Sequence, residues 1–445
     1  MTPPIAESAR PPGDVIRESA PMHSRAFRCR RFANWFPLGL TYACFYMGRY
    51  NFNVAKGAIG AAYHYDKAQM GLIATAGFWT YALSVIFNGP LADRFGGRRA
   101  ILFGTLGAAA LNLALGALFF GGLATHLILS MSLLYAANSY FQSFGALSVV
   151  KVNSAWFHVR ERGVLGGVFG SMISMGYALA LITGGWVLVH LPLWCVFAIP
   201  AGALLILFAV DLFLVKNRPS DSGYADFATG DEGADQAASE RPRFFDTVRH
   251  VLSVPVIRLL MLAEFCTGLV RQGLMLYFTE FLDEVHGVKP GSGLFQVASW
   301  GVTGGGIAGA LLCGVLSDRL FQSRRAPVAF LFYVGQLVSL IVLGLATSPL
   351  FAALMIGVCC MWIFGVHGML SGTASMDFGG RKAAATAAGL LDGVQYLGAG
   401  LVGFGLGALI EHYHWKIWPY ALLPFSLAGA LLMLPLWNAR AKGTC

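Results

Sequence analysis

Charged residues are scarce in this chain of 445 residues: Asp, Glu, Lys and Arg make up 12% of it, against 56% hydrophobic residues. A soluble domain carries about 25% charged residues. The chain also contains repeated apolar runs that are long enough to cross a bilayer as helices. These runs do not alternate polar and apolar positions, which excludes the strands of a membrane β-barrel. The composition therefore predicts an all-α polytopic membrane protein.

Several other signals are missing. The eight cysteines are scattered, without the spacing of a disulfide framework or a metal site. Glycine runs such as GVTGGGIAG lie inside apolar segments with no strand before them, so they predict close helix packing rather than nucleotide loops. The N-terminal residues lack the apolar stretch of a cleavable signal peptide. We therefore expect no enzyme activity, no metal, no nucleotide and no other cofactor.

The net charge of +9 could indicate nucleic acid, but its distribution argues against such a partner. Basic residues cluster in short loops between the apolar runs, as in the cytoplasmic loops of helical membrane proteins. The clusters are Arg25, Arg28, Arg30 and Arg31; Arg94, Arg98 and Arg99; Arg160 and Arg162; Arg319, Arg324 and Arg325; Arg381 and Lys382. We expect a multi-pass monomer in a bacterial inner membrane, surrounded by lipid, with both termini in the cytoplasm.

The apolar runs predict twelve spans in two sets of six. The spans are residues 34–60, 68–90, 99–121, 127–150, 162–187 and 193–215, then 257–283, 294–317, 326–346, 349–374, 383–409 and 416–437. The expected organisation is a disordered tail (1–33), a first half (34–215), a polar linker (216–256), a second half (257–437) and a short tail (438–445). The linker's FFDTVRHVL segment is expected to form a short surface helix.

The two halves repeat one another. The loop sequence GPLADRFGGRRA has a counterpart in CGVLSDRLFQSRRA, and Asp93 and Asp318 are offset by 225 residues. Arg49 and Arg271 are offset by 222 residues. Parallel repeats of six helices are typical of major facilitator transporters, in which substrate lies near the midplane between the halves. The repeat therefore predicts a major facilitator fold that moves its substrate by alternating access.

The repeated loops carry the charges Asp93, Arg94 and Arg98 in the first half, and Asp318 and Arg319 in the second. Charges at such tight loops can pair with the ends of neighbouring helices, which indicates a conformational latch. A plain positive-inside loop is the alternative.

Arg49 and Arg271 each lie near the middle of an apolar segment. A guanidinium at that depth costs at least ~2.5–3.5 kcal/mol, so it persists only beside a partner or a water-filled cavity. One such arginine in each half predicts an internal anion site in a membrane transporter. A structural pairing with a buried carboxylate is the alternative for Arg271.

The first span carries a polar stripe. Tyr42, Tyr46, Arg49, Asn53 and Lys56 fall on one helical face, which must line an internal cavity because lipid cannot accept it. Lys56 lies about 10 Å along the helix from Arg49. It could contact the anion or, equally, reach the outer interface as a snorkelling side chain.

Other polar residues inside the spans have two interpretations each. Glu264 could relay protons or neutralise the empty site, or it could balance Arg258. Asp392, beside Gln395 and Tyr396, could be functional or could be a structural partner of an arginine. Asn138 and Gln142 could donate to a substrate or join helices by hydrogen bonds. We interpret His367 as a satisfied packing residue.

These segments together resemble the organophosphate:phosphate antiporter family of the major facilitators. The resemblance covers nearly the whole membrane region and rests on YACFYMGRYNF, VRQGL, ERGVLGGV, FQSFG and RKAAATAAGLLDGVQYLG. It implies that Arg49 and Arg271 clamp a phosphate group. It also implies that the pocket is lined by Tyr42, Tyr46, Tyr81, Gln142 and Tyr396.

The chain departs from the glycerol-3-phosphate transporters of that family at three positions. Val85, Ile173 and Thr303 stand where those transporters have a lysine, a histidine and a glutamate. We therefore expect a different, larger substrate, with Lys56 supplying the lost positive charge and with Asp392 and Gln395 recognising hydroxyls.

We expect the chain to exchange a phosphorylated organic anion for inorganic phosphate. A proton- or sodium-coupled symporter of an organic carboxylate, with Asp392 or Glu264 as the coupling group, is one alternative. A sugar-phosphate sensor is the other.

Overall fold

A computed structural model describes residues 23–120, 126–158, 161–229, 244–322 and 324–439 of the chain. Within these ranges the chain is all helical, as the composition predicts. The first set of helices is α1 (Arg25–Tyr63), α2 (Lys67–Phe95), α3 (Gly97–Phe120), α4 (Leu127–Gln142), α5 (Phe144–Trp156), α6 (Arg162–His190) and α7 (Cys195–Leu214).

The connecting stretch contains the short 3₁₀ turn η2 (Pro219–Ser222) and helix α9 (Phe244–Ser253). Helix α9 confirms that the FFDTVRHVL segment is helical. The second set is α10 (Pro255–His286), α11 (Gly293–Leu320), α12 (Arg325–Gly344), α13 (Pro349–His367) with η4 (Gly368–Ala374), α14 (Ser375–Tyr413), α15 (Ile417–Ala421), α16 (Leu423–Met433) and η5 (Leu434–Leu436).

The twelve-span fold is confirmed. Among the described residues, ten helical segments are long and apolar enough to cross a membrane. Two further spans do not meet this criterion. Helix α1 is less hydrophobic because of its polar stripe, and the fourth span is divided into the two shorter helices α4 and α5.

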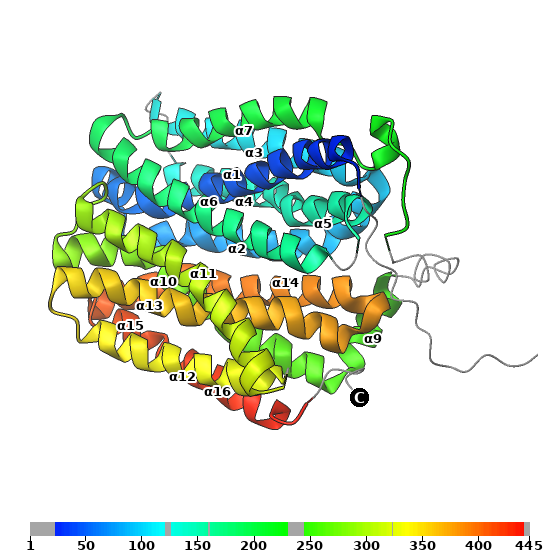
Figure 1. Ribbon diagram of the computed structural model, residues 1–445. Helices are drawn as coiled ribbons and strands as arrows, with labels where there is room; N and C mark the ends of the chain where they lie inside the picture. Colours follow the sequence, from blue (N-terminus) through cyan, green and yellow to red (C-terminus); the bar gives the residue numbers. More distant parts are fainter. Residues whose placement is uncertain (1–22, 121–125, 159–160, 230–243, 323, 440–445) are drawn as a thin grey trace, which may run out of the picture.

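The helices form two layers (Figure 1). Helices α1–α7 make one layer and α10–α16 the other, and they meet where α2 packs on α14, α6 on α11, and α1 on α10. The start of α1, helix α9 and the last described turn, η5, lie toward one end of the molecule, called here the terminal end. The opposite end is called the far end.

Helix α1 begins at Arg25 rather than at residue 34, so the prediction of a disordered tail is wrong for Arg25 to residue 33. The Ser24 side chain caps this helix by accepting from the Phe27 backbone N–H at 3.2 Å. Arg30 donates to the Leu214 carbonyl at 2.7 Å, and Arg31 pairs with Glu161 at 2.9 Å. These contacts anchor the first turns. Residues 1–22 of the predicted tail lie outside the described residues, as do residues 440–445 of the C-terminal tail.

Glycines let α11 and α13 approach closely, as the glycine runs predict. A Cβ atom added at Gly305 would meet the Gly357 carbonyl oxygen, and one added at Gly309 would meet the Met361 carbonyl oxygen. Backbones in membrane interfaces approach this closely only where the intervening residues are small.

Replacing Gly309 by alanine is therefore expected to destabilise the protein by about 1–3 kcal/mol, because the two helices must separate. Thermal unfolding of the purified protein in detergent measures this loss. Gly304→Ala, on the same helix, is the control, since a Cβ at Gly304 meets nothing within 4 Å. Equal unfolding temperatures for the two variants would contradict the packing described here.

Candidate functional site

Arg49 of α1 is almost fully buried at the interface between the layers, with 2% of its surface exposed. Its Nε donates to Gln142 at 2.8 Å, and its Nη1 donates to the hydroxyl of Tyr396 on α14 at 3.0 Å. The guanidinium carbon lies 4.2 Å from the ring centroid of Tyr81 and 5.2 Å from that of Tyr46. Such contacts stabilise the cation through the ring quadrupole. Nη2 has no hydrogen-bond partner among the described residues.

Arg271 of α10 is its counterpart in the second layer and is also 2% exposed. Its Nη2 donates to the hydroxyl of Tyr177 on α6 at 3.1 Å, and its Nη1 lies 3.1 Å from Nε2 of His367. Its Nε has no hydrogen-bond partner in the described part of the chain. Each arginine therefore reaches a tyrosine of the opposite layer and keeps one buried N–H group unpaired.

Tyrosine rings fill the space around the two cations. The centroids of Tyr42 and Tyr46 lie 5.5 Å apart, and those of Tyr81 and Tyr396 lie 4.4 Å apart. Tyr50 and Tyr177 join them, with centroids 4.2 Å apart. Neither residue is among the predicted site residues. Tyr50 continues the four-residue spacing of Tyr42 and Tyr46, whereas no sequence signal identifies Tyr177.

The predicted polar residues of α14 lie in the same region. Asp392 is half-buried and interacts electrostatically with both Arg49 and Arg271. Gln395 is fully buried, and its side-chain amide lies 3.2 Å from Nδ1 of His367. The structure thus brings Asp392 and Gln395 together with the two arginines.

His367 and Glu264 also belong to this cluster. Nδ1 of His367 lies 3.5 Å from Oε2 of Glu264, whose side chain is fully buried. Glu264 therefore faces His367, which argues against its interpretation as a partner of the exposed Arg258. His367 contacts Arg271 on one side and Glu264 on the other, contacts that its interpretation as a packing residue did not predict. The position of His367 inside an apolar span was the sequence feature that could have indicated such contacts.

Lys56 lies apart from this cluster, about two turns further toward the far end. It is fully buried and forms an ion pair with Glu280 of α10 at 2.5 Å. Its Nζ also lies 3.7 Å from the ring centroid of Tyr277. The alternative of a snorkelling lysine is therefore wrong, because the buried carboxylate of Glu280 supplies a partner inside the protein.

Asn138 joins helices, as one of its two interpretations predicts. It donates to the Gly48 carbonyl at 3.3 Å and accepts from Asn112 at 3.2 Å. Gln142 donates to Asn138 at 3.1 Å, so this network also orients the amide that accepts from Arg49.

Hydrogen bonds between the layers continue from the arginines to the far end. Asn53 donates to the Met275 carbonyl at 2.9 Å, and Thr279 donates to the Asn53 carbonyl at 3.0 Å. Thr75 donates to the Gly400 carbonyl at 2.7 Å. Lys67 pairs with Glu284 at 3.0 Å at the far end itself. Hydrogen bonds and ion pairs therefore hold the two layers in contact between the arginines and the far end.

The repeated loops lie at the terminal end. Arg98 donates to the Leu212 carbonyl at 2.6 Å, in the last turn of α7, so it does pair with a neighbouring helix end. Asp318 pairs with Arg325 at 3.0 Å. Arg94 and Arg319 are exposed. The side chain of Asp93 lies outside the described residues. A latching role for these loops stays a prediction.

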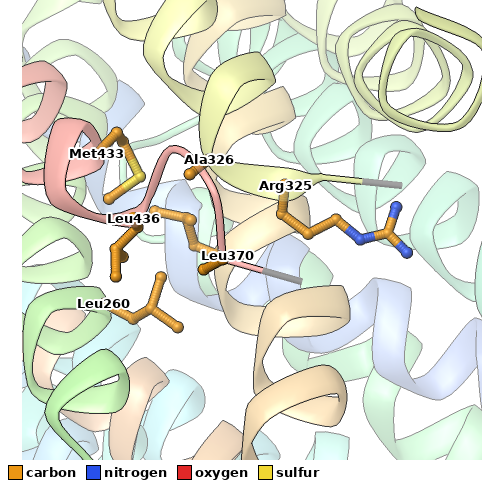
Figure 2. Close-up of a pocket in the computed structure, with 7 residues that line it drawn as sticks. Leu260, Arg325, Ala326, Leu370, Met433 and Leu436 are labelled. Carbon is orange, nitrogen blue, oxygen red and sulfur yellow. The ribbon is translucent and has the colours of Figure 1, made fainter. Parts of the chain in front are cut away.

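Hollows also occur elsewhere among the described residues. A small one of about 10 Å³ at the terminal end is lined by Leu260, Leu370 and other apolar residues, and the Arg325 side chain extends away from it (Figure 2). A larger one of about 300 Å³ lies near the far end, beside Glu280. Neither is lined by the two arginines. The buried arginine cluster, with its unpaired donors, is therefore the candidate site.

The Lys56–Glu280 pair gives a prediction for stability. Glu280→Gln leaves Lys56 buried without a counter-charge, which is expected to cost about 3–5 kcal/mol. Adding Lys56→Met should recover most of that loss, because the uncompensated charge is removed. Thermal unfolding of the single and double variants measures both effects.

The control for this experiment is Glu284→Gln, which breaks the more exposed pair with Lys67. We expect it to change stability by no more than about 1 kcal/mol. A Glu280→Gln variant as stable as Glu284→Gln would show that Lys56 does not depend on Glu280.

Comparison with known proteins agrees with this architecture. Residues 38–403 match the family model of the Major Facilitator Superfamily. The chain is 30% identical over 413 residues to the membrane sensor protein UhpC of Salmonella typhimurium, covering 90% of each chain. It is 24% identical to a probable hexose phosphate transport protein of Chlamydia pneumoniae, covering 94% of each chain. It is also 24% identical to the glycerol-3-phosphate transporter of Bacillus subtilis, covering 93% of this chain and 94% of that protein.

The solved structure of a D-xylose-proton symporter shares the fold, with a TM-score of 0.73 and 12% identity over 93% of this chain and 98% of that one. The chain therefore belongs to the major facilitator superfamily, as an integral multi-pass membrane protein of the organophosphate:phosphate antiporter family rather than an enzyme.

Proposed function

We propose that this protein exchanges a phosphorylated organic anion for inorganic phosphate across a bacterial inner membrane. The observation that carries the proposal is the pair of buried arginines, one from each half. Arg49 and Arg271 each keep an unpaired N–H group in a region that excludes water. Guanidinium groups bind phosphate oxygens through paired, charge-assisted hydrogen bonds, and can replace the hydration that the anion loses.

The position of the arginines couples binding to movement. Arg49 belongs to residues 34–215 and Arg271 to residues 257–437, so an anion held by both attracts the two halves toward each other. Without an anion, the two guanidinium groups have no shared ligand, and of the acidic residues nearby Asp392 interacts with both, which slows reorientation of the empty protein. Exchange of one anion for another follows from this difference.

Hydrogen bonds on the far-end side of the arginines support alternating access. The pair Lys56–Glu280 and the bonds of Asn53 close the interface there. Rocking of the halves about the anion site would break these contacts and expose the site to the far end. The basic loops gather at the terminal end, which supports a cytoplasmic location for both termini.

The relatives support a phosphorylated substrate, since several are named as hexose phosphate or glycerol-3-phosphate transport proteins. Tyr42, Tyr46 and Tyr81 provide aromatic surfaces beside the arginines for the organic part of such a substrate. Asp392 and Gln395 provide oxygen and amide groups suited to hydroxyls. We propose that a single chain carries out the exchange.

A second candidate is a sensor that binds the same anion without transporting it. The observation that favours it is the name of two relatives, the membrane sensor proteins UhpC of Salmonella typhimurium and Escherichia coli. Binding without flux is the property that separates this candidate from the first.

Exchange of labelled phosphate into liposomes loaded with phosphate tests the proposal. Arg49→Lys and Arg271→Lys keep the charge but lose the planar pair of donors. Each is expected to weaken phosphate binding by about 10–100-fold, the equivalent of one charge-assisted hydrogen bond of about 1.5–3 kcal/mol, and to reduce exchange accordingly.

Arg258→Lys is the matched control, because Arg258 lies on α10 with Arg271 but is exposed. It should exchange phosphate like the wild type. Phosphate binding by wild-type protein without exchange would favour the sensor. Wild-type protein that neither binds nor exchanges phosphate would refute both candidates.

A further inference from the structure

His367 of α13 bridges two charged groups of α10. Its Nε2 lies 3.1 Å from Nη1 of Arg271, and its Nδ1 lies 3.5 Å from Oε2 of Glu264. Glu264 is fully buried, and its Oε1 has no hydrogen-bond partner among the described side chains. This carboxylate is therefore placed behind the histidine, on the side away from Arg271.

The hydrogen bonds assign one protonation state to His367 in the structure. Arginine can only donate, so Nε2 accepts from Arg271, and the single proton of a neutral imidazole is on Nδ1. Two groups lie within reach of that proton, Oε2 of Glu264 at 3.5 Å and the side-chain amide of Gln395 at 3.2 Å. The structure has the amide nitrogen of Gln395 3.2 Å from Nδ1 and leaves its Oε1 without a partner. A proton on Nδ1 requires the flipped amide, in which the oxygen faces the ring and accepts from it.

The charges around the arginines determine how unfavourable it is to bury an anion there. Arg49 and Arg271 supply two positive charges, and the carboxyl groups of Asp392 and Glu264 lie near them. A phosphate dianion entering this cluster adds two further negative charges in a buried region, where uncompensated charge is strongly unfavourable. A proton taken up with the anion offsets part of that cost.

The groups that face Glu264 come from several helices. They are His367 on α13, Asp392 on α14, Tyr333 on α12, the Ser371 backbone in η4, and Arg271 on its own helix. His367 differs from the others because its Nε2 accepts from Arg271. This nitrogen loses its partner when Arg271 donates to an anion instead. Asp392 is the competing proton acceptor, since it faces both arginines.

We propose that His367, supported by Glu264, binds a proton together with the transported anion. As Arg271 turns from Nε2 toward the anion, Nε2 takes a proton from solvent or from a monoanionic phosphate. The resulting imidazolium donates through Nε2–H to the anion and through Nδ1–H to Glu264. Only N–H and O–H bonds change, and one proton moves for each anion bound. The inference rests on the proposed function, because it needs an anion at the arginines.

The role of Glu264 is to stabilise the imidazolium. A buried imidazolium beside Arg271 would meet a like charge, whereas the carboxylate behind the ring supplies the opposite one. Proton uptake on binding also has a defined sign: anion affinity rises as the pH falls and weakens as the pH rises.

Calorimetry of the full-length protein with inorganic phosphate tests this proposal. Titrations at about pH 8, where phosphate groups are largely dianionic, are repeated in buffers with different heats of ionisation. The dependence of the binding heat on the buffer gives the number of protons taken up. We expect roughly one proton for each phosphate bound by the wild type. His367→Gln should reduce this number to near zero, and Glu264→Gln should reduce it strongly.

His412→Gln, at an exposed position of α14, is the matched control and should behave as wild type. The proposal is overturned by phosphate binding without proton uptake in the wild type, or by unchanged uptake in His367→Gln. Uptake that disappears in Asp392→Asn but persists in the folded Glu264→Gln variant would assign the proton to Asp392 and would also overturn it. Absence of any phosphate binding by the wild type would refute the proposed function as well, which distinguishes the two failures.

Discussion

The structure depends on how two guanidinium groups are accommodated in an apolar interior. Arg49 and Arg271 are each 2% exposed, at a depth where an isolated cation costs several kcal/mol. The protein offsets this cost with tyrosine rings and hydroxyls, the Gln142 amide and His367. These groups leave one N–H of each arginine unpaired. The site is thus stabilised enough to fold, yet retains donors that an anion can satisfy.

The same arrangement links chemistry to architecture. Each arginine donates to a tyrosine of the opposite half, Arg49 to Tyr396 and Arg271 to Tyr177, so the cluster itself is part of the interface. An anion that competes for these donors changes contacts between the halves. Toward the far end, the buried Lys56–Glu280 pair closes the interface with charges that do not depend on an anion. In the proposed exchange, binding and closure are therefore assigned to separate sets of residues along α1 and α10.

The sequence alone was sufficient to predict the twelve-span fold, because span length and hydropathy are local properties. It also identified Arg49 and Arg271, since a charge in an apolar span requires a partner wherever the helix packs. Of their partners, Gln142 and Tyr396 were among the predicted pocket residues, but others could not be predicted. Glu280, Tyr177 and His367 depend on which helix faces are opposed, and that is set by tertiary packing. Lys56 is the clearest example. The sequence placed it on the polar stripe of α1, but did not indicate that its partner would be Glu280 on α10.

The central claim is that both arginines hold one and the same phosphate. A double-mutant cycle on phosphate binding, using Arg49→Lys, Arg271→Lys and the combined variant, tests it most directly. If the two groups share one anion, the double variant should lose less binding free energy than the two single losses combined, by about 0.5–3 kcal/mol. Losses that add within about 0.5 kcal/mol, or single variants that bind phosphate like the wild type, would contradict the account.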